Sequence, residues 1–236
     1  MKVVILAGGL GTRISEETTD KPKPMVLLNG RPMLWHIMNV YASQGLTDFI
    51  VATGYKGEVI SQWVSGLETN WNISTVNTGL ETQTGGRIKM CMELFPEERV
   101  LATYGDGLGN VNVSRLLDFH YSHGKSATLT AVRPPARFGY LDTLNGQVLH
   151  FGEKNQSDAG WINGGFFVLE SKVSKYINSL SEPFETGALP KLTEEKQLMA
   201  YEHFGFWQPM DTLREKNDLE KLALREPPPW LEDLGQ

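Results

Sequence analysis

The chain has 236 residues, of which 40% are hydrophobic and 21% charged, and its formal net charge is −6. A chain of this length can bury a sizeable core without disulfides, and its one cysteine, Cys91, excludes an internal disulfide framework. The acidic balance argues against general nucleic-acid binding, and no apolar run approaches the roughly 20 residues of a membrane span. Because the first residues lead directly into glycines without a signal-peptide cleavage pattern, we expect a cytoplasmic protein that binds neither nucleic acid nor membrane.

The first half of the chain has the pattern of a parallel α/β sheet. Residues 2–7 form a continuous apolar run that ends at Gly8, which predicts a buried central strand. Residues 33–44 have helical spacing and end at Gly45, and residues 48–53 predict the next strand, so these segments form a βαβ unit. A looser repetition of the pattern predicts helices at 58–64 and 87–94 and strands at 73–77 and 100–104.

The second half of the chain predicts a mixed arrangement. A helix over 116–123 ends at Gly124, and a strand covers 127–133. Short strands at 138–142, 147–151 and 161–169 indicate an antiparallel excursion on the main sheet. Helices are expected at 171–180, 186–195 and 212–225, with a strand near 197–202. We therefore expect an α/β domain over residues 1–226, with a Rossmann-like, mixed but mostly parallel sheet flanked by helices, followed by a Pro-rich tail, 227–236, as an extended arm.

A glycine-rich loop with basic neighbours follows the first strand: Leu6-Ala7-Gly8-Gly9-Leu10-Gly11-Thr12-Arg13, and then Lys23. Backbone N–H groups in such a loop can approach an anion closely, and Arg13 and Lys23 supply cations for phosphate. The loop is not a dinucleotide fingerprint, because Ile14 stands where that pattern needs glycine, and it is not a P-loop. A tight turn with solvated charges is the plainer alternative, but glycines and cations after a buried strand favour a phosphate site.

Two aspartates are candidate metal ligands. Asp106 lies between Gly105 and Gly107 at the end of the strand predicted over 100–104, at the edge where open α/β sheets bind ligands. Asp211 directly precedes a predicted helix. Alone, Asp106 is typical of a turn and Asp211 of a helix N-cap. Together with the basic loop, they predict a Mg²⁺ ion held by these carboxylates and by substrate phosphates.

Several motifs along nearly the whole chain resemble those of the sugar-1-phosphate nucleotidyltransferases, and among these the glucose-1-phosphate cytidylyltransferases. They are the loop 6–13, Lys21-Pro22-Lys23-Pro24-Met25, Thr84-Gly85-Gly86-Arg87, Tyr104-Gly105-Asp106-Gly107, and the segments 162–167 and 206–212. The resemblance implies a nucleotide-binding fold on which CMP passes from CTP to glucose 1-phosphate. It also implies that Mg²⁺ is required, that pyrophosphate is released and that the protein is a homo-oligomer.

The resemblance also implies roles for individual residues. Arg13, Lys23, Asp106 and Asp211 would form the catalytic set, with the two aspartates as metal ligands. The loop 6–13 and Lys23 would bind nucleotide and phosphate together with Thr82, Arg87 and Gly105. The acceptor would be bound by Glu153, Lys154, Asn163 and Gly164, although an exposed turn lysine is the plainer interpretation of Lys154.

Alternatives to this function stay open at the level of the sequence. Residues 58–83 form a shorter segment than in the glucose enzymes, so a different sugar phosphate or a non-sugar phosphorylated acceptor is the first alternative. A catalytically silent nucleotide-sensing subunit is disfavoured, because a sensor needs no metal bridge between two aspartates. His120 and His123 stand three apart on a predicted helix, and a packing or surface role is favoured over a metal site. Trp207 is of interest because it lies four positions before Asp211.

Overall fold

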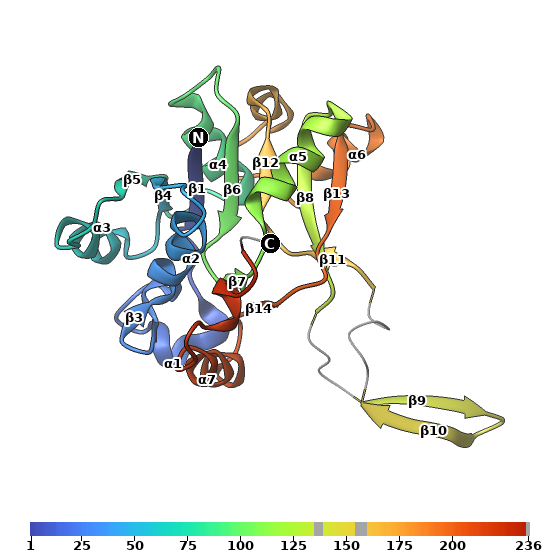
Figure 1. Cartoon of the computed structure of the whole chain (residues 1–236). Helices are drawn as coiled ribbons and strands as arrows, with labels where there is room; N and C mark the ends of the chain where they lie inside the picture. Colours follow the sequence, from blue (N-terminus) through green and yellow to red (C-terminus); the bar gives the residue numbers. More distant parts are fainter. Residues whose placement is uncertain (135–138, 154–159, 235–236) are drawn as a thin grey trace.

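The computed structural model describes residues 1–134, 139–153 and 160–234. In this part of the chain an eight-stranded sheet runs in the order β11-β8-β12-β6-β1-β4-β5, with β13 paired to β8, and helices cover both of its faces (Figure 1). Its strands are β1 (Lys2–Ala7), β4 (Asp48–Thr53), β5 (Asn72–Asn77), β6 (Val100–Tyr104), β8 (Ala127–Val132), β11 (Ile162–Asn163), β12 (Phe167–Leu169) and β13 (Leu198–Glu202). The predicted fold class is confirmed.

The parallel half of the sheet positions the candidate site. β1 lies between β4 and β6 and is parallel to both, with Ile5 opposite Val51 and Thr103. Because strand side chains alternate, Ile5 faces one layer of helices and Leu6 the other. The first layer contains α2 (Met33–Ala42), α3 (Gly57–Ser65), α5 (Val113–His123) and α7 (Leu213–Leu222), and the second contains α4 (Thr84–Glu93) and α6 (Ala188–Glu194). The predicted βαβ unit and its central strand are confirmed.

Within the described residues, three two-stranded ribbons lie outside the main sheet. β7 (Gly107–Gly109) pairs with β14 (Trp207–Pro209), and β2 (Leu27–Leu28) pairs with β3 (Arg31–Pro32). β9 (Gly139–Leu144) and β10 (Gln147–Glu153) form an antiparallel hairpin that stands apart from the main sheet in Figure 1. The loop after β1 continues through short turns, η1 (Thr12–Ile14), α1 (Ser15–Thr18) and η2 (Lys23–Met25).

The middle of the chain departs from the sequence prediction in two places. The β9-β10 hairpin is a sheet of its own rather than an excursion on the main sheet. The predicted strand over 161–169 is two strands, because Gly165 and Phe166 both adopt positive φ, 79° and 47°, and interrupt the extended backbone. These two strands still pair antiparallel to β8 and β6 in the main sheet.

The helices agree with the sequence less closely than the strands do. The predicted helix over 171–180 is a 3₁₀ helix, η4 (Ser171–Tyr176). The Ser174 hydroxyl donates to the Ser171 carbonyl oxygen at 2.9 Å, and such local bonds compete with those of an α-helix. α4 begins at Thr84, three residues before the predicted start, so its first turn contains the Thr-Gly-Gly-Arg motif.

The C-terminal segment packs against the body of the protein, so the prediction of an extended arm is wrong. Pro229–Leu231 forms the 3₁₀ turn η5, and the Trp230 side chain is completely buried. Its ring meets the His36 ring edge-on, with 5.4 Å between the centroids. The Asn112 side-chain amide donates to the Leu234 carbonyl at 3.0 Å. The prolines favour extended backbone, but burial of one tryptophan determines where that backbone lies.

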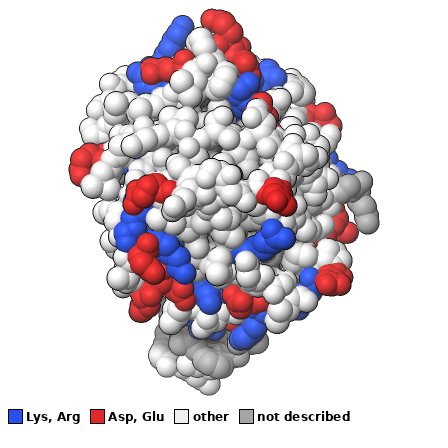
Figure 2. Space-filling view, turned by 90° about the vertical axis from the view of Figure 1, so that its left-hand side faces the viewer, with Lys and Arg blue, Asp and Glu red and all other residues white. Residues whose placement is uncertain are grey.

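The surface shows how the charges are distributed. On the face in Figure 2, Lys and Arg side chains lie among Asp and Glu side chains, and they form no continuous basic patch there. No described helix has the length and apolar character that crossing a membrane requires.

We expect Trp230→Ala to lower the free energy of unfolding by about 3–5 kcal/mol, because it empties a filled site between His36 and Phe206. Urea denaturation measures the change. Leu224→Ala is the matched control, since this nearby side chain is 67% exposed and its truncation should change stability by less than about 0.5 kcal/mol. Equal effects of the two substitutions would contradict the packed position of the tail.

Candidate active site

A cavity of about 370 Å³ opens at the carboxyl ends of β1 and β6. Every residue predicted to bind nucleotide or metal lines it: Leu6, Ala7, Gly8, Gly9, Leu10, Gly11, Thr12, Arg13, Lys23, Thr82, Arg87, Gly105, Asp106 and Asp211. The other lining residues, to which the sequence analysis assigned no individual role, are Pro24, Leu80, Gln83, Thr84 and Tyr104. The fold thus brings residues of five separate motifs to one edge of the sheet, as expected for an open α/β sheet.

Lys23 lies on the cavity wall between two carboxylates. Its ammonium nitrogen Nζ is 2.8 Å from Asp106 Oδ2 and 2.7 Å from Asp211 Oδ1, and its side chain is only 11% exposed. Burial alone would lower the pKa of Lys23, but the two carboxylates outweigh it and raise this pKa above its ordinary value. The ammonium therefore stays charged in this partly desolvated position.

The pairing of β7 with β14 brings the two aspartates together. Gly107 lies opposite Pro209, and the Met210 N–H donates to the Asp106 carbonyl oxygen at 2.8 Å. Each strand has three residues, and about a hundred residues separate them along the chain. This short ribbon is the reason why Asp106 and Asp211 share one cation.

The carboxylate of Asp211 faces the cavity because another residue caps α7. The Thr212 hydroxyl accepts from the Glu215 N–H, and the Glu215 carboxylate accepts from the Thr212 N–H, which completes a capping box. Asp211 Oδ2 is 3.3 Å from Nη1 of Arg13, whose side chain is 77% exposed at the cavity mouth. The N-cap role that the sequence allows for Asp211 therefore belongs to Thr212.

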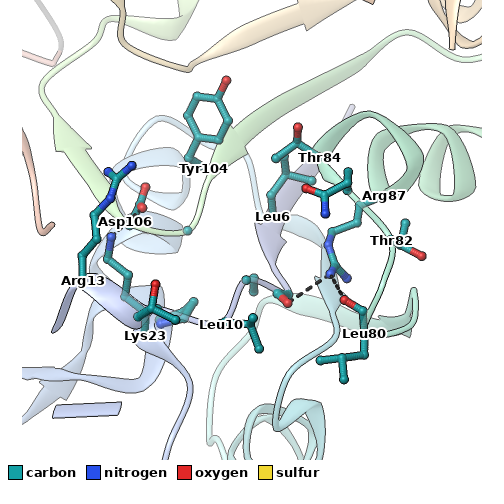
Figure 3. A pocket seen from close by; sticks show the side chains of 18 of the residues that line it. Leu6, Leu10, Arg13, Lys23, Leu80, Thr82, Thr84, Arg87, Tyr104 and Asp106 are labelled. Carbon is teal, nitrogen blue, oxygen red and sulfur yellow. Dashed lines mark hydrogen bonds and ion pairs between the residues drawn. The ribbon is translucent and has the colours of Figure 1, made fainter. Parts of the chain in front are cut away.

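The cavity has two chemically different sides. Figure 3 shows Arg13, Lys23 and Asp106 on one side and Leu80, Thr82 and Arg87 on the other. Leu10 and Leu80 line the cavity although each is more than half exposed. One side thus offers charged groups, and the other offers accessible apolar surface.

Arg87 is 4% exposed and forms no ion pair with a carboxylate of the described residues. Its Nη2 donates to the Gly8 carbonyl at 3.0 Å, and its Nη1 donates to the carbonyls of Thr53 and Gly79, both at 3.0 Å, and to the Thr78 hydroxyl. Burial lowers the pKa of Arg87, but a guanidinium remains charged at neutral pH. This side chain fixes the loop after β1, and direct contact with a ligand stays a prediction.

Of the four residues predicted to bind the acceptor, the structure describes three and leaves Lys154 out. The Asn163 amide nitrogen donates to the Tyr104 hydroxyl at 2.9 Å, which connects Asn163 to the cavity wall. Gly164 is buried, and its carbonyl accepts from the Trp207 indole N–H at 2.9 Å. Glu153 is the last residue of β10, and Lys154 lies outside the described residues.

The two histidines of α5 belong to a hydrogen-bonded chain away from the cavity. The Lys125 N–H donates to His123 Nδ1, so His123 Nε2–H donates to the Thr128 hydroxyl at 2.8 Å. That hydroxyl then donates to His120 Nδ1 at 2.8 Å, and His120 Nε2–H donates to Glu170 at 3.1 Å. Both rings thus have the packing role that the sequence favoured.

Fold and cavity together define a nucleotide-binding α/β protein, because a glycine-rich loop, cations and two carboxylates meet at the carboxyl ends of parallel strands. The chain belongs to the nucleotidyl transferase family, whose model matches residues 2–221. The sequence resemblance to this class is confirmed.

Two curated relatives and one solved structure illustrate the family. The chain is 47% identical to the glucose-1-phosphate cytidylyltransferase of Salmonella typhimurium, over 98% of each chain. It is 32% identical to the D-glycero-alpha-D-manno-heptose 1-phosphate guanylyltransferase of Aneurinibacillus thermoaerophilus, over 87% of this chain and 89% of the relative. HddC from Yersinia pseudotuberculosis, solved in complex with GMP-PN, superposes with a TM-score of 0.74 at 25% identity, over 93% of this chain and 98% of that one.

We expect Gly8→Ala to destabilise the nucleotide-free protein by about 1–3 kcal/mol, because the added Cβ would overlap the buried Arg87 guanidinium. Gly9→Ala is the matched control, since a Cβ there meets nothing within 4 Å. Chemical denaturation of both variants without nucleotide gives the comparison. If Gly9→Ala were as destabilising as Gly8→Ala, Arg87 would not fix the loop as described.

Stability should also depend on pH through the histidines. Burial lowers the pKa of His36, His120, His123 and His203 below the ordinary value near 6.5. The unfolded chain therefore binds more protons below that pH, and the free energy of unfolding falls as the pH drops from about 7 to 5.5, by at most about 1.4 kcal/mol per pH unit for each histidine. Urea denaturation across this range tests the sign. His120→Gln should make the free energy of unfolding depend less steeply on pH. An unchanged slope in this variant would contradict the contribution of His120.

Proposed function

We propose that this chain transfers CMP from CTP to glucose 1-phosphate, which yields CDP-glucose and pyrophosphate. The Salmonella typhimurium relative supports this choice of substrates, because the identity of 47% extends over 98% of both chains. The structural observation that carries the proposal is the Lys23 ammonium between Asp106 and Asp211, on the wall of a cavity lined by the glycine-rich loop.

Mg²⁺ is the metal that this donor set fits. Asp106 and Asp211 direct carboxylate oxygens at one cationic point, which the Lys23 ammonium occupies. Hard carboxylate oxygens suit Mg²⁺, which takes one or two of them from a protein and its other ligands from phosphates and water. The described residues contain no group of three or more His, Cys, Asp or Glu placed for a metal, so phosphates and water would complete the coordination. Bound Mg²⁺ would neutralise phosphate charge and polarise phosphoryl oxygens.

The reaction requires positioning and charge neutralisation rather than a nucleophilic side chain. An anionic oxygen of the acceptor phosphate attacks the α-phosphorus of CTP, and the bond from that phosphorus to the departing pyrophosphate breaks. Backbone N–H groups of the loop 6–13 bind phosphate oxygens, and Arg13 and Lys23 stabilise charge on the α-phosphate and the pyrophosphate. Because nearby carboxylates raise the pKa of Lys23, its ammonium is charged before the substrates bind.

We place the nucleobase on the other side of the cavity. Leu80 lies on that side, and Leu10 lies between it and Lys23 (Figure 3). The two side chains are 55% and 53% exposed, and an aromatic base would cover both. Thr82 lies beside them, although its hydroxyl already donates to the Thr78 carbonyl oxygen. The apolar contacts would hold the ring of any base, so the preference for CTP must come from polar groups at the ring edge.

A different phosphorylated acceptor is the second candidate. The guanylyltransferase relative, 32% identical, is named for a heptose 1-phosphate, so members of this family with comparable chains differ in both base and sugar. A panel of acceptors must therefore accompany the panel of nucleotides in any test.

The test is pyrophosphate release with Mg²⁺ and glucose 1-phosphate, measured in parallel with CTP, UTP, dTTP, ATP and GTP. We expect CTP to exceed each of the others by about tenfold or more in kcat/KM, since a site that pairs with base-edge groups rejects bases that lack them. A higher rate with another nucleotide, or with another sugar phosphate in place of glucose 1-phosphate, would contradict the proposal.

The same assay tests the metal ligands. Asp106→Asn and Asp211→Asn should each reduce kcat by about 100-fold or more, because electrostatic groups at the reacting phosphate are worth several kcal/mol. Asp118→Asn, on the exposed face of α5, is the matched control and should retain full activity. Full activity of either active-site variant would contradict the assignment of the metal to these two carboxylates.

A further inference from the structure

A carboxylate that no motif indicated joins two walls of the cavity. The Tyr104 hydroxyl donates to Glu185 Oε1 at 2.6 Å, and the Thr84 hydroxyl donates to Glu185 Oε2 at 2.6 Å. Tyr104 ends β6 and Thr84 begins α4, and both line the cavity. Figure 3 shows both hydroxyls directed to the same side, away from Leu10. Glu185 is not itself a lining residue, but it joins two side chains that are.

The same bridge fixes Asn163. Its Nδ2 donates to the Tyr104 hydroxyl at 2.9 Å, and its Oδ1 accepts from the Gly165 N–H at 3.0 Å. These two bonds determine which way the amide faces, and they leave the second Nδ2 proton without a partner among the described residues. A chain of hydrogen bonds thus runs from Thr84 through Glu185 and Tyr104 to Asn163, with an available donor at its end.

The charges give this side of the cavity a preference for hydroxyl groups. Glu185 forms no ion pair with a Lys or Arg of the described residues, and the two side chains that donate to it, Thr84 and Tyr104, do so through neutral hydroxyls. Burial, and then the neighbouring Glu185 carboxylate, raise the pKa of Tyr104, so the phenol keeps its proton and remains a donor. An unneutralised carboxylate repels phosphate but accepts hydrogen bonds from hydroxyls. Phosphates would lie toward Lys23, and hydroxyls toward Glu185.

We propose that Glu185 is a positioning residue for the acceptor, which holds Tyr104 and through it Asn163 so that this side of the cavity selects a phosphorylated compound rich in hydroxyl groups. The inference rests on the proposed function, because it assumes that a sugar phosphate accepts the nucleotidyl group. It assigns acceptor selectivity in part to the segment before α6, which is remote in sequence from the glycine-rich loop.

The test compares Glu185→Ala, Glu185→Gln and Tyr104→Phe in the 236-residue chain. Each should raise the KM for glucose 1-phosphate, by about tenfold for Glu185→Ala, as expected for lost hydrogen bonds to a charged group, while the KM for CTP changes by less than about twofold. Glu185→Gln keeps an oxygen for Tyr104 and should have the smaller effect. Tyr104→Phe retains the ring that packs edge-on against Phe167, so its fold is preserved.

Glu182→Gln is the matched control. Glu182 lies in the same segment, pairs with Lys191 at 2.6 Å and accepts from the Asn178 N–H, but its side chain forms no hydrogen bond with Tyr104 or Thr84. Its substitution tests whether loosening the segment alone changes acceptor binding, and both KM values should stay within about twofold of the unmodified protein. A rise in the acceptor KM as large as that of Glu185→Ala would overturn the inference.

A second readout is independent of folding. The unmodified protein should prefer glucose 1-phosphate over analogues that lack one hydroxyl, and this preference should decrease in Tyr104→Phe and Glu185→Ala. Equal increases of both KM values, or unchanged selectivity among the analogues, would overturn the inference. If the unmodified protein uses another sugar phosphate, the proposed function fails, and the variants are assayed with that sugar. If its best acceptor carries no hydroxyl groups, the inference itself is wrong.

Discussion

The structure depends on the close approach of three backbone segments around the Arg87 guanidinium. They lie at Gly8, at Thr53 and at Thr78-Gly79, and each accepts a hydrogen bond from Arg87. Gly8 and Gly54 follow the parallel strands β1 and β4, and a Cβ on Gly54 would lie 2.6 Å from Arg87 Nη1. A separate close approach follows β6, where a Cβ on Gly105 would lie 2.5 Å from the Leu6 carbonyl oxygen. Real side chains cannot occupy these spaces, so glycine at each position allows the strand ends to converge. The charge of Arg87 then holds the loop carbonyls in place.

This arrangement also determines the electrostatics of the cavity. Arg87 is satisfied by neutral oxygens and keeps its positive charge, whereas the charge of Lys23 is matched by two carboxylates. An entering phosphate would therefore be attracted by Arg13, Lys23 and Arg87. Of these three, Arg87 is the one whose charge no carboxylate of the described residues neutralises. Under the proposed function, the buried cation would contribute to anion binding while its donors stay on the loop carbonyls and the Thr78 hydroxyl, because the Coulomb attraction needs no direct contact.

The sequence predicted the parts of this site that depend on local pattern. Apolar runs and glycines located β1, β4 and the loop 6–13, since a buried parallel strand has a continuous signal over six residues. The β7-β14 ribbon has no such signal, because strands of three residues show no periodicity and their pairing joins distant parts of the chain. The sequence therefore suggested that the two aspartates act together but not how they meet. Similarly, one buried side chain, Trp230, determined the path of the tail against the preference of its prolines.

Glu185 shows why an acceptor site is harder to predict than a phosphate site. Phosphate recognition uses backbone N–H groups and nearby cations, which neighbouring residues in one loop can supply. Hydroxyl recognition needs several donors and acceptors at fixed angles, and here Thr84, Tyr104 and Asn163 come from three different elements. A single carboxylate from a fourth segment makes their orientations depend on one another. A substitution at such a junction would alter the acceptor side without moving the phosphate loop, and the two relatives described above are named for different sugar phosphates.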